Sequence, residues 1–139
     1  MMVPRELPGT AEAEHREPNL PPGSGIVLVG GAMMVVGAFG PWIGGKVFGV
    51  ATGIELGGDG WLVFAVAGLA LVPVLLRICG PTARGAWISV LALVGAYVCW
   101  THYTQAHADG VQVVWGLELA GVGSALLAAG GLRILLDRS

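Results

Sequence analysis

The sequence predicts an all-α membrane protein built as a bundle of four transmembrane helices. Hydrophobic residues make up 55% of the 139 residues and charged residues only 12%, about half the share of charge in a soluble domain. The mean hydropathy is +0.76. Four long apolar stretches follow one another, and about 20 such residues cross a hydrocarbon core of about 30 Å. In addition, alternating spans place six of the seven basic residues on one side of a membrane.

Residues 1–24 form the first segment, which we expect to be a disordered cytoplasmic tail. The segment holds five prolines and four glutamates and has almost no apolar periodicity, so it cannot bury enough surface to fold. A cleaved signal peptide is the alternative, but a signal begins with a short basic region, which this acidic segment is not. The first span, at residues 25–43, is therefore interpreted as a membrane helix.

The first outer loop, from Gly40 to Gly60, is rich in glycine. Between the glycines lie β-prone residues, which predict a short β-hairpin: Val47, Phe48, Val50, Thr52 and Ile54. Asp59 precedes the second span and can cap its first turn. Asp59 and Glu55 are also candidate cation ligands, although two carboxylates fall short of a calcium-loop pattern. Capping and turn formation are the favoured interpretation.

The second and third spans are predicted at residues 61–79 and 86–103. Arg77 lies close enough to the end of the second span for its side chain to reach the headgroups. Pro73 should kink this helix, because proline lacks an N–H and clashes with the carbonyl of Leu69. Such a defect is tolerated in a membrane when a neighbouring helix or a hydroxyl re-satisfies the freed group.

The fourth span, at residues 113–136, must contain an ionisable side chain. Only 14 uncharged residues separate Glu118 from Arg133, which is too short to cross. Glu118 is the strongest candidate for a functional side chain, because a carboxylate inside a membrane helix is costly. Its proximity to the start of the helix favours instead an interfacial carboxylate paired with Lys46, a histidine or a tryptophan. Residues 137–139 form a cytoplasmic end.

Small residues mark the expected helix contacts, since close van der Waals packing holds helices together in lipid. On the fourth helix the small face comprises Gly121, Ser124, Ala125 and Ala128, with Glu118 at its border and pointing inward. On the third helix the small face comprises Ala92 and Ala96 with Ser89 and Cys99. We expect these two faces to meet.

The basic residues set the orientation. The inner segments hold six arginines and the outer loops hold Lys46 alone, so both termini are predicted to be cytoplasmic. Aromatic residues mark the predicted span ends, as an interfacial belt requires: Trp42, Trp61, Trp100, Tyr103 and Trp115 at outer ends and Trp87 at an inner end.

Catalytic and metal-binding patterns are sparse. Cys79 and Cys99 fall at opposite ends of their helices, so no disulfide joins them.

The second outer loop is predicted to contain His102, His107 and Asp109. These residues would form a zinc site with one more ligand such as Glu55. Their spacing is not diagnostic, and exposed polar loop residues are the favoured interpretation. Nucleotide and catalytic-triad motifs are absent from the sequence, so we expect no enzyme activity, no cofactor, no bound metal and no nucleic-acid partner.

Three junctions carry a resemblance to known proteins: Phe39-Gly40-Pro41-Trp42, Gly58-Asp59-Gly60-Trp61 and Trp115-Gly116. Over about residues 25 to 136 the chain resembles small four-span integral membrane proteins of actinobacteria that have no assigned activity. Its topology also resembles that of claudins, but their paired loop cysteines are missing here. The resemblance implies a multi-pass inner-membrane protein and assigns no catalytic residue.

Two functions remain open from the sequence. The first is a non-enzymatic accessory or interaction component of the bacterial plasma membrane, which contacts the lipid bilayer and a membrane protein partner or further copies of itself. The second is a small transporter or channel subunit that uses Glu118 together with the kink at Pro73. The sequence identifies neither ligand nor partner.

Overall fold

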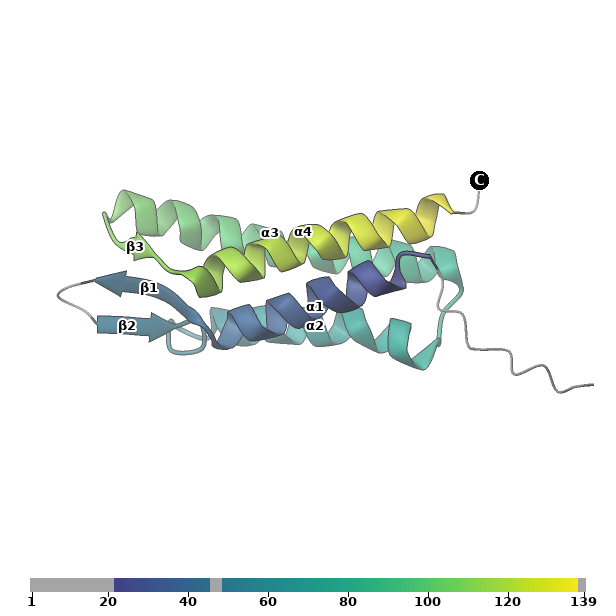
Figure 1. The fold of residues 1–139 in the computed structure, drawn as a ribbon, viewed down its shortest axis with the longest axis horizontal. Coiled ribbons are helices and arrows are strands. Elements are labelled where there is room, and N and C mark those ends of the chain that lie inside the picture. The colour runs from purple at the N-terminus through teal and green to yellow at the C-terminus, as the bar shows by residue number, and fades with distance from the viewer. Residues whose placement is uncertain (1–21, 46–48, 138–139) are drawn as a thin grey trace, which may run out of the picture.

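The computed structural model describes residues 22–45 and 49–137. In chain order its elements are α1 (Ser24–Phe39), β1 (Pro41–Gly45), β2 (Gly49–Thr52), α2 (Asp59–Leu76), α3 (Pro81–Ala108), β3 (Gln112–Val113) and α4 (Trp115–Leu136). The helices of the described part form an up-down-up-down bundle in which α1 and α3 both flank α4, and a small sheet lies at one end (Figure 1). Residues 1–21, most of the predicted tail, lie outside this description, as do Lys46, Val47 and Phe48 of the predicted hairpin.

Three described helices, α2, α3 and α4, are long and apolar enough to cross a membrane. The helix α1 has 16 residues and a length of about 24 Å. It ends at Phe39, whereas the predicted first span continues to residue 43, so the prediction is wrong at that end. The helix stops at Phe39 because the residue before a proline is driven into an extended conformation. Gly40 has φ −74° and ψ 166°, and Pro41 begins β1.

The third helix is longer than predicted. It begins at Pro81, a residue suited to the first helical position, and continues for 28 residues to Ala108, a length of about 42 Å. His102 and His107 therefore lie on α3 and not in a loop, which corrects the prediction. The connection to α4 is correspondingly short.

Helices α1 and α4 pack through glycines that are spaced seven residues apart on each helix. A Cβ placed on Gly123 would lie 2.6 Å from the carbonyl oxygen of Gly30, and one on Gly37 would lie 2.6 Å from the amide nitrogen of Ala120. Further along, a Cβ on Gly130 would lie 2.6 Å from a methyl carbon of Val27. Because seven residues make nearly two helical turns, these glycines share one face and let the two backbones touch.

The small-residue prediction for α3 and α4 is confirmed in part. Ala92 and Ser124 are fully buried, and a Cβ on Gly131 would lie 2.7 Å from Oγ of Ser89 on α3. Ala96, Gly121 and Ala128 are only half-buried, and Ala125 is exposed. The prediction for Ala125 is wrong because the packed face of α4 is centred on Gly123, from which Ala125 is about 200° around the helix.

The sheet has the strand order β2-β1-β3, and all its pairs are antiparallel. The predicted hairpin in this loop is present as β1–β2, but its first strand precedes the predicted run and Ile54 lies beyond β2. Strand β3 comes from the segment between α3 and α4 and was not predicted. We call β1, β2, β3 and the turn 53–58 the cap. Trp42 in β1 joins the cap to the bundle: its side chain is fully buried, and its Nε1 donates to the carbonyl oxygen of Gly37 at 2.9 Å. Trp42 therefore has no place in an exposed aromatic belt.

Pro73 lies inside α2, one turn before the helix ends. The carbonyl oxygen of Leu69, four residues earlier, accepts a hydrogen bond from Nε1 of Trp87 on α3 at 3.4 Å. The neighbouring helix α3 thus supplies a donor in place of the N–H that proline lacks, which is one of the two alternatives that the sequence left open.

Candidate functional site

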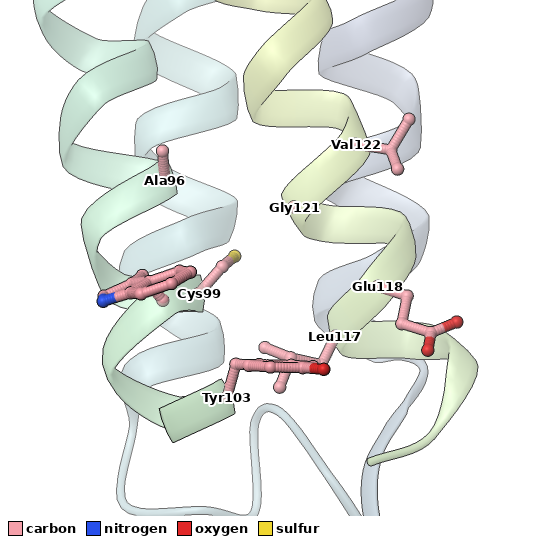
Figure 2. A pocket seen from close by; sticks show the side chains of 8 residues that line it. Ala96, Cys99, Tyr103, Leu117, Glu118, Gly121 and Val122 are labelled. Carbon is pink, nitrogen blue, oxygen red and sulfur yellow. The ribbon is translucent and has the colours of Figure 1, made fainter. Parts of the chain in front are cut away.

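Glu118 lies in the first turn of α4, where a carboxylate interacts favourably with the helix dipole. It borders a hollow of about 560 Å³ between α3 and α4, which we call the α3–α4 groove. The groove is lined by Ala96, Cys99, Trp100 and Tyr103 of α3 and by Leu117, Glu118, Gly121 and Val122 of α4. Figure 2 shows the ring of Tyr103 reaching from α3 toward Leu117, and the carboxylate of Glu118 pointing away from α3.

The prediction that Glu118 points inward is wrong. The side chain is exposed, and it shares the outer face of α4 with Ala125, because seven residues return almost to the same side of a helix. Among the described residues Glu118 forms no ion pair. Its predicted partner Lys46 lies outside them.

The side chains of Asp59 and His102 form a hydrogen bond at the junction between the cap and the bundle, and the contact becomes an ion pair when His102 is protonated. Oδ2 of Asp59, the first residue of α2, is 2.7 Å from Nε2 of His102 on α3. The histidine ring packs edge-on against Trp42, with ring centroids 5.2 Å apart. Asp59 does not cap the helix as predicted, because Gly58 holds the N-cap position with φ 94° and no side chain caps it.

Glu55 closes the turn between β2 and α2. Its carboxylate accepts from the amide of Thr52 at 2.9 Å, and the amide of Glu55 donates to Oγ1 of Thr52 at 3.4 Å. This reciprocal pair is a capping box. The backbone bond first, and the Thr52 hydroxyl second, lower the pKa of Glu55 from its usual 4.5. Glu55 therefore shapes the turn and does not meet Asp59 at a shared cation site.

The predicted metal ligands do not converge. His102 pairs with Asp59, and His107 stacks on Tyr103 with ring centroids 6.4 Å apart. In residues 22–45 and 49–137, no group of three His, Cys, Asp or Glu side chains could hold a metal ion. Cys79 and Cys99 are both free thiols, the first exposed and the second buried, which agrees with the predicted lack of a disulfide.

The interior of the described bundle holds few polar side chains. Those that are buried are Ser24, Arg84 and Ser124. Ser124 bonds to the carbonyl of Ala120 on its own helix, and Arg84 donates to the carbonyl of Cys79 at 2.7 Å. Oγ of Ser24 and Nε of Arg84 have no hydrogen-bond partner among the described residues. Ser24 begins α1 and Arg84 lies in the first turn of α3, both at the end away from the cap, so the three side chains do not line a route through the bundle.

No protein-family model, curated protein or solved structure matches this chain. The resemblance to actinobacterial four-span proteins therefore stays a prediction. The fold and the site define a class only: a helical bundle with helices long enough to span a membrane, an ordered cap at one end, and an open groove on one side.

Three features were not predicted from the sequence: the buried Trp42, the Asp59–His102 pair and the glycine packing of α1 against α4. One of these has a signal in the sequence: Gly23, Gly30 and Gly37 repeat every seven residues, as do Gly116, Gly123 and Gly130. The other two depend on contacts between segments far apart in the chain, which no local pattern indicates.

Proposed function

We propose that this chain is a non-enzymatic, multi-pass component of the bacterial plasma membrane that presents its cap to a membrane-associated protein partner. The observation that carries the proposal is the cap itself, a sheet fixed to the bundle through the buried Trp42. At its edge strand β2, Val50 is 67% exposed. A short edge strand with an exposed apolar side chain offers both main-chain hydrogen bonds and a contact surface to a partner.

Four membrane spans are proposed, although α1 is short. In its support, α1 lies beside α4 from one end to the other, with Gly23 near Gly130 and Gly37 near Gly116. Because α4 is long enough to cross a membrane, a helix packed along it crosses too.

The proposed orientation places the cap outside the cell. The described basic residues, Arg77, Arg84 and Arg133, all lie near the end of the bundle away from the sheet. Positive charge of this kind is retained on the cytoplasmic side. The partner would accordingly bind the cap at the outer surface of the membrane.

Transport through Glu118 and Pro73 has less support. Pro73 lies near the end of α2 away from the cap and Glu118 in the first turn of α4 at the cap end, and Glu118 is on the exposed side of its helix. A proton path would need these groups to be joined through the bundle. The buried polar side chains described above provide no such chain.

The test is purification in mild detergent with quantitative mass spectrometry of retained proteins. We expect Val50→Glu to reduce retention of a specific partner by at least about fivefold, since a charge in an apolar contact commonly costs more than 1 kcal/mol. Gln112→Glu, at the opposite edge of the sheet, is the control and should retain the partner. Equal retention by both variants would contradict the proposed surface, and loss of ion-coupled uptake in Glu118→Gln would favour transport instead.

A further inference from the structure

We propose that a hollow between the cap and the end of α3 binds a lysine side chain of the protein partner. The proposal rests on the proposed function, because the cap is the surface that the partner meets, and it names the chemistry that holds this partner. The hollow shares no lining residue with the α3–α4 groove.

The size of the hollow suits one side chain. Its volume is about 190 Å³, below the range of about 300–1,000 Å³ for sites that enclose a whole small ligand. Apolar walls come from β1, from the turn 53–58 and from the segment before β3, at Ile43, Leu56 and Val111. The hollow also adjoins the strand proposed to bind the partner, because the amide of Leu56 donates to the carbonyl oxygen of Thr52 at the end of β2, at 3.2 Å.

The polar part of the lining offers hydrogen-bond acceptors. The carboxylate of Asp109 only accepts, and the side-chain amide of Gln105 includes a carbonyl oxygen. The third polar side chain is His102, whose Nε2 is 2.7 Å from Oδ2 of Asp59. Because an ionised carboxylate has no proton to donate, Nε2 of the neutral ring carries the proton and Nδ1 is left as an acceptor. Three acceptors around one hollow favour a ligand group that only donates.

A lysine side chain matches both parts of this lining. Its compact ammonium has three donors and no acceptor, and its positive charge is attracted by the carboxylate of Asp109. Its alkyl stem is apolar and lies along the walls formed by Ile43, Leu56 and Val111.

The hollow is open to a partner in water. Helix α3 has 28 residues and a length of about 42 Å, which exceeds a hydrocarbon core of about 30 Å. Its last turns therefore extend beyond the hydrocarbon at the cap end, and Gln105 and Asp109 are both exposed there.

The experiment uses n-butylammonium as the probe, because it matches a lysine side chain beyond Cα. The full chain in a non-ionic detergent is titrated at pH 8, above the usual range of histidine protonation, and NMR follows the His102 ring and the Gln105 side-chain amide. We expect saturable binding with a Kd of about 1–10 mM, within the limit for so small a ligand. The uncharged n-butanol should bind at least about fivefold more weakly, since hydrogen bonds to charged groups are the stronger ones.

Asp109→Asn tests the charge of the hollow while keeping its volume. We expect it to weaken binding of n-butylammonium by about two- to fivefold, the range of an exposed ion pair. The matched control Asp137→Asn removes a carboxylate at the other end of the bundle and should bind as the wild type does. Equal Kd values for the two variants, or equal binding of n-butanol and n-butylammonium, overturn the proposal. Tighter binding in Lys46→Gln than in the wild type also overturns it, because a lysine of the same chain would then fill the hollow.

Retention of the partner separates the hollow from the edge strand β2. In the mass-spectrometric assay given above, Asp109→Asn should retain about two- to fivefold less partner, whereas Asp137→Asn should retain it fully. Full retention by Asp109→Asn would overturn a lysine of the partner as the occupant even if n-butylammonium binds. Loss of the partner in Asp109→Asn with full retention in Val50→Glu would support the hollow and contradict the proposed surface at β2.

Discussion

The bundle and the cap are held together by different means. In the bundle, α1 and α4 meet backbone to backbone at Gly30 and Gly123, and shape alone fixes their distance. In the cap, directional contacts join it to the helices: Trp42 to Gly37, five residues earlier at the end of α1, and Asp59 to His102, 43 residues later on α3. We therefore expect added side-chain volume to destabilise the bundle, and loss of a hydrogen bond or a charge to destabilise the cap.

Trp42 belongs to both regions, so its removal should have the largest effect. We expect Trp42→Ala to lower the free energy of unfolding by about 3–5 kcal/mol, the usual cost of truncating a buried tryptophan. The control Trp61→Ala, at a ring that is 54% exposed, should cost far less. Thermal unfolding in detergent measures both. Equal losses would show that Trp42 does not join the cap to the bundle.

Gly123→Ala tests the bundle alone. The added methyl would lie 2.6 Å from the carbonyl oxygen of Gly30, and because backbone cannot move aside, we expect a loss of about 1–3 kcal/mol. The same change at Gly68, where nothing lies within 4 Å, should stabilise α2 by about 0.5–1 kcal/mol through helix propensity. Unfolding in a graded series of denaturing detergent compares them. A stabilised Gly123→Ala would exclude direct contact of the two backbones.

The sequence predicted the bundle better than it predicted the cap, for a physical reason. Apolar length and charge are local properties, and they located all four helices, whereas glycines and β-prone residues indicated a hairpin without locating its first strand. The face of α4 that packs is set by the glycines of α1 that it contacts. For this reason the burial of Ala125 and the direction of Glu118 were predicted wrongly, although Gly123 lies only two residues from Ala125. The polar composition of the last turns of α3 did not indicate that this helix continues to Ala108, which places β3 directly after it. The contact of Asp59 with His102 depends on how α2 and α3 pack, which no local pattern indicates.

Asp59→Asn tests the contacts between cap and bundle. His102 is 22% and Asp59 47% exposed, and solvent screening limits such pairs, so we expect a loss of about 0.5 kcal/mol. The difference from wild type should shrink in high salt. Asp109→Asn, at the exposed end of α3, is the control and should change nothing. Thermal unfolding at two salt concentrations provides the measurement; an effect insensitive to salt would contradict an electrostatic contribution from this pair.

Glu55→Gln should have the smallest effect, confined to the turn of the cap. The pKa of Glu55 lies below 4.5 in the folded chain because the Thr52 amide donates to its carboxylate. A lowered pKa means that the carboxylate stabilises the turn fully above pH 4.5, and that this stabilisation is lost as the pH falls through the folded pKa. Hydrogen exchange at the Thr52 amide, corrected for intrinsic rates, should therefore become less protected in acid in the wild type, whereas Glu55→Gln should show no such pH dependence. Because Glu55 lies far from the glycines of α1 and α4, amides at Gly30 and Gly123 should be unaffected in both proteins, and a change there would mean that the cap and the bundle open together.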